Sequence, residues 1–307
     1  MKMSIDIFGF RALWSPYFLA SLVVITLLYF LIVGPWRHRF AHSEPTSVNT
    51  KILFAIGMIL LYACKGSPID LLGHMTMTAH MTQMAVLYLI VPAFFILGVP
   101  NWLWRKFINL KVIKPLFTFL TKPLIALVIF NGSFSMYHIP LIFDFVKTNV
   151  FIHAATTIFI FIAAFFMWWP LINKLEEWNT LHGLKKVGYI FADGMLLTPA
   201  CALIIFSDTA MYSTYTDLSA WMNALALCVP ASMLSSINLT GPEMFNFMPP
   251  LEDQRTGGVI MKIIQEFVYA ILLAKVFFEW VRKEREQEKL LDEQLLEKQQ
   301  LLEPQTN

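Results

Sequence analysis

The stretch GHMTMTAHMTQMAVLYLIVPAFFILGVP, residues 73–100, contains no lysine, arginine, aspartate or glutamate. Its apolar part, residues 81–99, is close to the length that an α-helix needs to cross the roughly 30 Å hydrocarbon core of a bilayer. Pro92 lies inside this range, and membrane helices tolerate such a proline because neighbouring groups satisfy the carbonyl that it leaves free. The stretch therefore predicts a transmembrane helix.

Six further apolar stretches lie before and after this one. Only 14% of the 307 residues are charged, against about a quarter in soluble domains, and the deficit is concentrated in these stretches. They are residues 17–33, 51–65, 122–137, 150–172, 187–206 and 259–281. We therefore predict an all-α integral membrane protein, a bundle of about seven transmembrane helices, located as a multi-pass protein in the cell membrane.

Lysine and arginine are concentrated in alternate loops. The loops after the first, third and fifth predicted spans are basic, whereas the intervening loops are poor in both residues. The basic residues are Arg37, Arg39 and Lys51, then Arg105, Lys106, Lys111, Lys114 and Lys122, then Lys174, Lys185 and Lys186. Because short cytoplasmic loops carry the excess of basic residues, we predict an N-terminus outside the cell and a C-terminus in the cytoplasm.

Residues 218–237 are apolar but are interrupted by Asn223, Pro230, Ser232, Ser235 and Ser236. An eighth span here would place the basic pair Arg282 and Lys283 outside the cell. We therefore predict that this segment is exterior and does not span, within one transmembrane domain of residues 1–281. Leucines recur at helical spacing in the charged residues 282–307, which predicts a cytoplasmic helical tail.

Four of the seven histidines are predicted to lie at the exterior ends of helices, at one level of the membrane. Three methionines share a broad helical face with one of them. The histidines are His74, His80, His138 and His153, and the methionines are Met77, Met81 and Met84. Imidazole and thioether ligands suit Cu(I), and the carboxylates that calcium prefers are absent from the cluster. The pattern predicts a candidate Cu(I) site, and the alternative is that the methionines only fill gaps in a helical core.

A haem site is an alternative interpretation of the same histidines, because two histidines on different helices can ligate haem iron axially. His80 and His153 would be the candidate pair. We consider haem the weaker alternative, since it also requires a cavity wide enough for a porphyrin.

Polar residues within the predicted spans form a second group of candidates. Lys262 and Glu266 are four residues apart in the last span, and Asp193 lies in the sixth. Ionisable groups at membrane depth tend to face the bundle interior and to mark ion or proton pathways. The alternative is that paired charges simply lower the cost of burial.

Several classes of function are disfavoured. A net charge of +2 is too small for a nucleic-acid binder. Three cysteines without regular spacing do not form a disulfide framework, and neither a nucleotide-binding motif nor a nucleophile elbow is present. We therefore predict a protein that is not an enzyme.

The chain resembles the CtaG family of multispanning cytochrome c oxidase assembly factors from Gram-positive bacteria. The resemblance rests on SIDIFGFRALWSPYF (4–18), HMTQMAVLYLIVPAFFILGVP (80–100), YHIP (137–140), His153 with MWWPL (167–171), MYSTY (211–215) and DQRTGG (253–258). It implies a membrane assembly factor required for active cytochrome c oxidase, acting through the handling or insertion of copper. The implied partners are oxidase subunits, copper chaperones and the lipid bilayer.

The family pattern in the third span resembles His-Met-x-Gln-His, and Met84 stands here in place of the second histidine. A site with two histidines on this helix is therefore in doubt, whereas a His/Met site for Cu(I) remains open. Three other functions also remain open: a copper transporter using Met195, Cys201, Glu266 and Asp193, a haem-binding electron carrier, and a metal-free scaffold for oxidase subunits.

Overall fold

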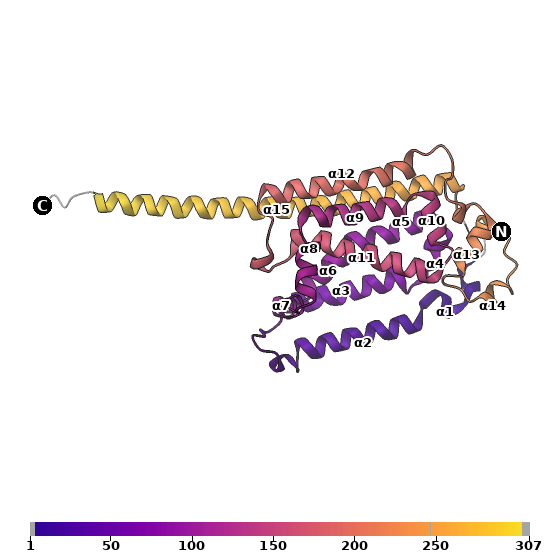
Figure 1. The fold of residues 1–307 in the computed structure, drawn as a ribbon, viewed down its shortest axis with the longest axis horizontal. Coiled ribbons are helices and arrows are strands. Elements are labelled where there is room, and N and C mark those ends of the chain that lie inside the picture. Colours follow the sequence, from indigo (N-terminus) through magenta and orange to yellow (C-terminus); the bar gives the residue numbers. More distant parts are fainter. Residues whose placement is uncertain (1–3, 246, 303–307) are drawn as a thin grey trace.

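The protein is described by a computed structural model that covers residues 4–245 and 247–302, with side chains up to residue 299. The described residues form helices and connecting turns without a β-strand. Figure 1 shows the long helices side by side in one bundle, with the C-terminal helix projecting from one end. The predicted all-α fold is confirmed for these residues.

Each of the seven predicted spans coincides with a helix. The helices are α2 (Pro16–Val33), α3 (Val48–Lys65), α5 (Met77–Ala85) continued through the π-helical turn Val86–Ile90 into α6 (Val91–Gly98), α9 (Pro123–Tyr137), α11 (Val150–Ile172), α12 (Leu184–Phe206) and α15 (Pro250–Leu302). By length and apolarity, five helices in the described residues qualify as spans, or six if α8 (Ile113–Leu120) and α9, which meet at 79°, form one bent span. The number seven and the orientation stay predictions.

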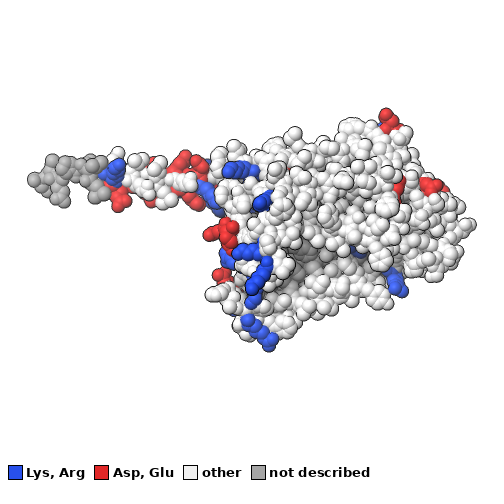
Figure 2. Space-filling model, viewed as in Figure 1, with Lys and Arg blue, Asp and Glu red and all other residues white. Residues whose placement is uncertain are grey.

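Short helices close the two ends of the bundle. They are α1 (Gly9–Trp14), α4 (Pro68–Met75), α7 (Asn101–Ile108), α10 (Pro140–Val146), α13 (Leu218–Leu225) and α14 (Ala231–Leu234). Helices α4, α10, α13 and α14 lie at one end, and α7 and α8 lie toward the other, from which α15 projects (Figure 1). Most of the lysine and arginine visible in Figure 2 lies at this second end.

The segment 218–237 folds as two short helices. Neither α13 nor α14 is long enough to cross a hydrocarbon core of roughly 30 Å. Trp221 and Leu225 of α13 pack instead against Leu71 of α4 in a separate buried cluster. The side of the membrane on which this segment lies stays a prediction.

Helix α15 runs without a break from the bundle into the charged segment that begins at residue 282. The side chains of residues 282–299 are exposed. The predicted tail therefore continues the last helix as far as the description reaches, and residues 303–307 lie outside the described residues.

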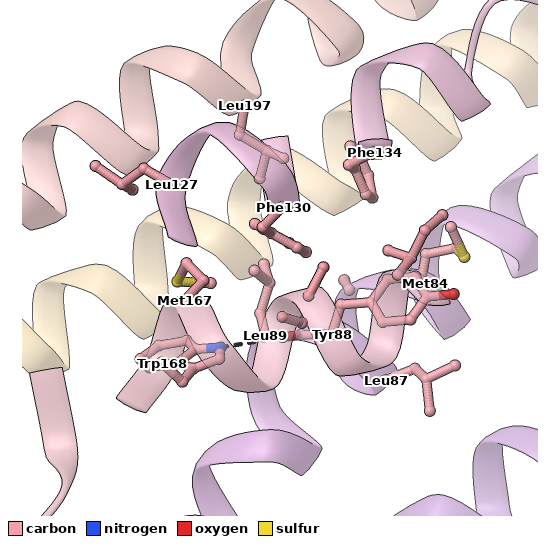
Figure 3. Close-up of a cluster of buried hydrophobic side chains, with 14 of the residues drawn as sticks. Met84, Leu87, Tyr88, Leu89, Leu127, Phe130, Phe134, Met167, Trp168 and Leu197 are labelled. Atoms are coloured by element: carbon pink, nitrogen blue, oxygen red, sulfur yellow. Dashed lines mark hydrogen bonds between the residues drawn. The ribbon is translucent and has the colours of Figure 1, made fainter. Parts of the chain in front are cut away.

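A backbone carbonyl that Pro92 leaves without its helical hydrogen bond is satisfied by a side chain of a neighbouring helix. Pro92 has no N–H to donate to the carbonyl of Tyr88, four residues earlier. The indole Nε1–H of Trp168 in α11 donates to that carbonyl instead, at 3.0 Å, within the core cluster of Figure 3. The expectation that a neighbour satisfies the freed carbonyl is confirmed.

The start of α5 is fixed by the first turns of α15. The buried carboxylate of Asp253 accepts hydrogen bonds from the backbone N–H groups of Met77 at 2.6 Å and Thr78 at 3.3 Å. A negative charge at a helix N-terminus is also favoured by the helix dipole. His80 lies within one turn of this junction, so α15 determines where His80 is placed.

Gly257 lies at the same junction, and a side chain there has no room. A Cβ at this position would lie 2.9 Å from the backbone oxygen of Met77 and 3.1 Å from the Cα of Thr78. We expect Gly257→Ala to destabilise the protein by about 1–3 kcal/mol, the usual cost of overpacking, in thermal unfolding of the purified protein. Gly132→Ala is the control, because nothing lies within 4 Å of its Cβ position. Equal stability of the two variants would contradict this description of the junction.

Candidate metal centre

The four predicted histidines form two neighbouring pairs at the end of the bundle that carries α4 and α10. The ring centroids of His80 and His138 are 6.2 Å apart, and those of His74 and His153 are 5.1 Å apart. His74, His80 and His138 are at most 2% exposed. The structure therefore brings together histidines from α4, α5, α11 and the C-terminal cap of α9.

A break in the chain separates the first two histidines. Thr76 adopts an extended conformation, ends α4 and caps α5 by accepting a hydrogen bond from the N–H of Ala79. His74 therefore belongs to the short helix α4, and His80 to the longer helical run. This break turns His74 toward His153 and leaves His80 beside His138.

The pair His80–His138 has ring nitrogens that contact no polar partner. Both nitrogens of His80 and Nε2 of His138 are buried without a hydrogen bond within the described residues. His138 Nδ1 lies 2.8 Å from the carbonyl oxygen of Phe134, and so donates its proton there and leaves the lone pair on Nε2. Each buried polar group without a partner costs about 1–3 kcal/mol, so the arrangement requires an explanation.

The groups around the pairs favour neutral imidazoles. Burial lowers the pKa of His138 to about 4. The hydrogen bond to Phe134 raises this pKa, and the charge of Lys147 lowers it further. Burial also lowers the pKa of His74 well below its ordinary value, and Lys147 lowers it further. Neutral imidazole is the form that ligates metal ions.

The methionines lie in the core. Met77, Met81 and Met84 are at most 5% exposed and belong to the main buried cluster. Figure 3 shows Met84 among aromatic and aliphatic side chains, including Tyr88. Their packing is that of core residues, and their role as ligands stays a prediction.

The structure adds two residues that the sequence interpretation did not include. Ligand atoms of Asp70, His74 and Cys228 all lie within 4.8 Å of one another. The thiol of Cys228 donates to Asp70 Oδ2 at 3.7 Å, and Asp70 forms an ion pair with Lys65. Cys228 lies in the segment 218–237, and its distance along the chain from α4 gave no signal of this contact.

A cavity of about 470 Å³ adjoins these residues. Its polar lining is formed by Lys65, Asp70, His74, His153, Thr157 and Cys228. The remaining wall is apolar, contributed by side chains of α2, α3, α11 and the π-helical turn, which include Phe18, Leu61, Leu87, Ile158 and Phe161.

The polar residues predicted within the spans lie elsewhere. Asp193 is buried and accepts hydrogen bonds from Asn131 at 2.6 Å and from the hydroxyl of Tyr269, so it ties α9, α12 and α15 together. Lys262 and Glu266 form an ion pair at 2.8 Å. Glu266 and Met195 line a surface hollow of about 210 Å³ whose lining does not include Asp193 or Cys201.

The bundle of apolar helices, several of spanning length, and the buried histidines define a multi-pass helical membrane protein. The sequence pattern of the cytochrome c oxidase caa3 assembly factor family (Caa3_CtaG) matches residues 27–283, and the chain belongs to this family. The resemblance seen in the sequence is thereby confirmed. Comparisons with curated proteins and with solved structures gave no match.

Lys147 makes the folded state sensitive to pH. Burial, together with the charge of Lys65, lowers the pKa of Lys147 to about 7, against an ordinary value of 10.5. Between these values the unfolded chain binds more protons than the folded protein, so stability should rise with pH, by up to about 1.4 kcal/mol per pH unit. We expect Lys147→Met to flatten this rise in thermal unfolding measured from pH 7 to 10.

The exposed Lys111 provides the control for this measurement. Lys111→Met should leave the pH dependence of the wild-type protein unchanged. A Lys147→Met protein whose stability rises with pH as steeply as that of the wild type would contradict the assignment.

Proposed function

We propose that the protein assists the assembly of active cytochrome c oxidase by handling Cu(I), which it holds between His80 and His138 and passes to an oxidase subunit. Membership of the oxidase assembly family supports the first part. The observation that carries the second part is the pair of neighbouring, buried imidazoles, three of whose four nitrogens have no hydrogen-bond partner among the described residues. A copper chaperone or free Cu(I) would be the source of the metal.

The spacing of the two rings suits one shared ion. A metal–nitrogen bond of about 2.0 Å places an imidazole centroid roughly 3 Å from the ion. Two imidazoles on opposite sides of one ion therefore have centroids about 6 Å apart, and those of His80 and His138 are 6.2 Å apart. Binding would also give a partner to His138 Nε2 and to one of the two His80 nitrogens.

The surroundings of this pair favour a soft, singly charged ion. The rings of Phe143 and Tyr137 lie 5.1 Å and 5.9 Å from that of His80. Imidazole without carboxylate suits Cu(I), and a monovalent ion is less costly to bury than a divalent one. These rings occupy the space that a porphyrin would need beside His80, which favours an ion over haem.

Direct binding tests the metal site. We expect the purified protein to bind Cu(I) in competition with a chromogenic chelator, and His80→Ala to weaken binding by about 100-fold or more, since even outer partners of metal ligands contribute 10–100-fold. The exposed His182 provides the control, and His182→Ala should bind as the wild type does. Wild-type protein that binds no Cu(I), yet co-purifies with the oxidase, would reject copper handling and favour the scaffold.

Oxidase activity in cells tests the assembly role. We expect a deletion strain to lose cytochrome c oxidase activity, and a gene carrying His80→Ala to restore less activity than the wild-type gene. Added copper should restore part of the activity, because a higher supply compensates for weaker handling. Full oxidase activity with full copper occupancy in the deletion strain would contradict the proposal.

A further inference from the structure

A second group of metal-ligating side chains lies beside the pair His80–His138 and is distinct from it. It consists of Asp70, His74 and Cys228, whose ligand atoms lie within 4.8 Å of one another. Ligands of one ion, each about 2.0–2.3 Å from it, lie at most about 4.6 Å apart. A displacement of a few tenths of an ångström would therefore allow these atoms to bind the same ion.

An unpartnered side chain points to a ligand at this place. His153 has both ring nitrogens buried without a hydrogen bond within the described residues. Its ring packs against that of His74 with centroids 5.1 Å apart, and both histidines line the 470 Å³ cavity together with Cys228. Two imidazoles and one thiol thus meet at the wall of a single cavity.

Cys228 also borders a second cavity. This cavity has a volume of about 280 Å³, and its lining also includes Arg11, Ser15, Tyr17 and Pro230. Cys228 is thus part of the lining of both cavities. His80 and His138 are part of neither lining, so an ion that enters either cavity would meet the lining residue Cys228 before it meets His80.

The charges around the group discriminate between ions. Lys65 forms an ion pair with Asp70, and Lys147 Nζ lies 3.1 Å from His74 Nδ1. Asp70 offsets the charge of Lys65, whereas Lys147 lies beside His74, so a divalent cation would leave more net positive charge in this group than a monovalent cation would. Cu(I) bound to a thiolate adds no net charge, and thiolate and imidazole are soft ligands that suit it.

We propose that Cys228, His74 and His153 form a second Cu(I) site that receives the ion before it reaches His80 and His138, with Asp70 positioning the thiol. The inference rests on the proposed function for the direction of transfer but not for binding. On binding, the Cys228 Sγ–H bond breaks, an Sγ–Cu bond forms, and the proton leaves to water. Copper remains Cu(I), so no electrons are transferred.

Protection of the thiol from alkylation tests this site in the full-length protein. Cys64, Cys201 and Cys228 are all free, and Cys228 alone is partly exposed, so mass spectrometry can follow each thiol separately with iodoacetamide. We expect two equivalents of Cu(I) to slow the alkylation of Cys228 at least tenfold and to leave the rates of the two buried cysteines unchanged. His74→Ala should abolish the protection, whereas His80→Ala should retain it.

A second readout does not depend on the reactivity of the thiol. Cu(I) bound to a thiolate absorbs in the near ultraviolet, and Cys228→Ser should lose this absorption while Cys201→Ser keeps it. Copper that binds without protecting Cys228 or producing this absorption would overturn the second site and leave the His80–His138 site standing. A second outcome would uphold this site and reject the first. In it, Cu(I) still protects Cys228, but His80→Ala changes neither the number of Cu(I) ions bound nor their affinity.

Discussion

His80 is buried with two ring nitrogens that have no hydrogen-bond partner in the described part of the chain, and copper handling at this place depends on the cost of that burial. The bundle maintains this cost because α5 is held at its first residues by the carboxylate of Asp253. His80 cannot turn toward water while Phe143 and Tyr137 pack around its ring. A ligand that binds these nitrogens would recover free energy that folding alone leaves unrecovered.

The histidine pairs differ in their surroundings, and this difference suggests an order of use. The pair His74–His153 borders a cavity and lies beside a thiol and two lysines, whereas the pair His80–His138 is enclosed by aromatic rings. An ion would lose its water in steps as it passes from the first pair to the second. The lysines near the first pair would oppose divalent ions before that loss begins. Selection of the ion and its later binding would thus occur at adjacent places at the same end of the bundle.

Much of the helical framework follows from the sequence, since charge-free stretches of spanning length can satisfy their backbone groups in lipid only as helices. The convergence of His80, His138 and His153 was also predictable, because helices that run in alternate directions bring these ends together. The contact of Cys228 with Asp70 was not predictable from the sequence. It joins residues 158 positions apart, and the short helices that bring them together pack without a periodic signal in the sequence. Nor did the sequence indicate the break at Thr76. The ligand role of Met84 and the number of spans remain predictions.

The atoms that coordinate bound copper decide whether His80 and His138 hold the ion. X-ray absorption at the copper edge, recorded on full-length Cys228→Ser protein loaded with one equivalent of Cu(I), reports the atoms that surround the ion when the thiolate site is absent. We expect imidazole nitrogens at about 2.0 Å from copper, with a nitrogen signal that decreases when His80→Ala is added. Copper surrounded only by oxygen, or a spectrum that is unchanged when His80→Ala is added, would contradict this expectation.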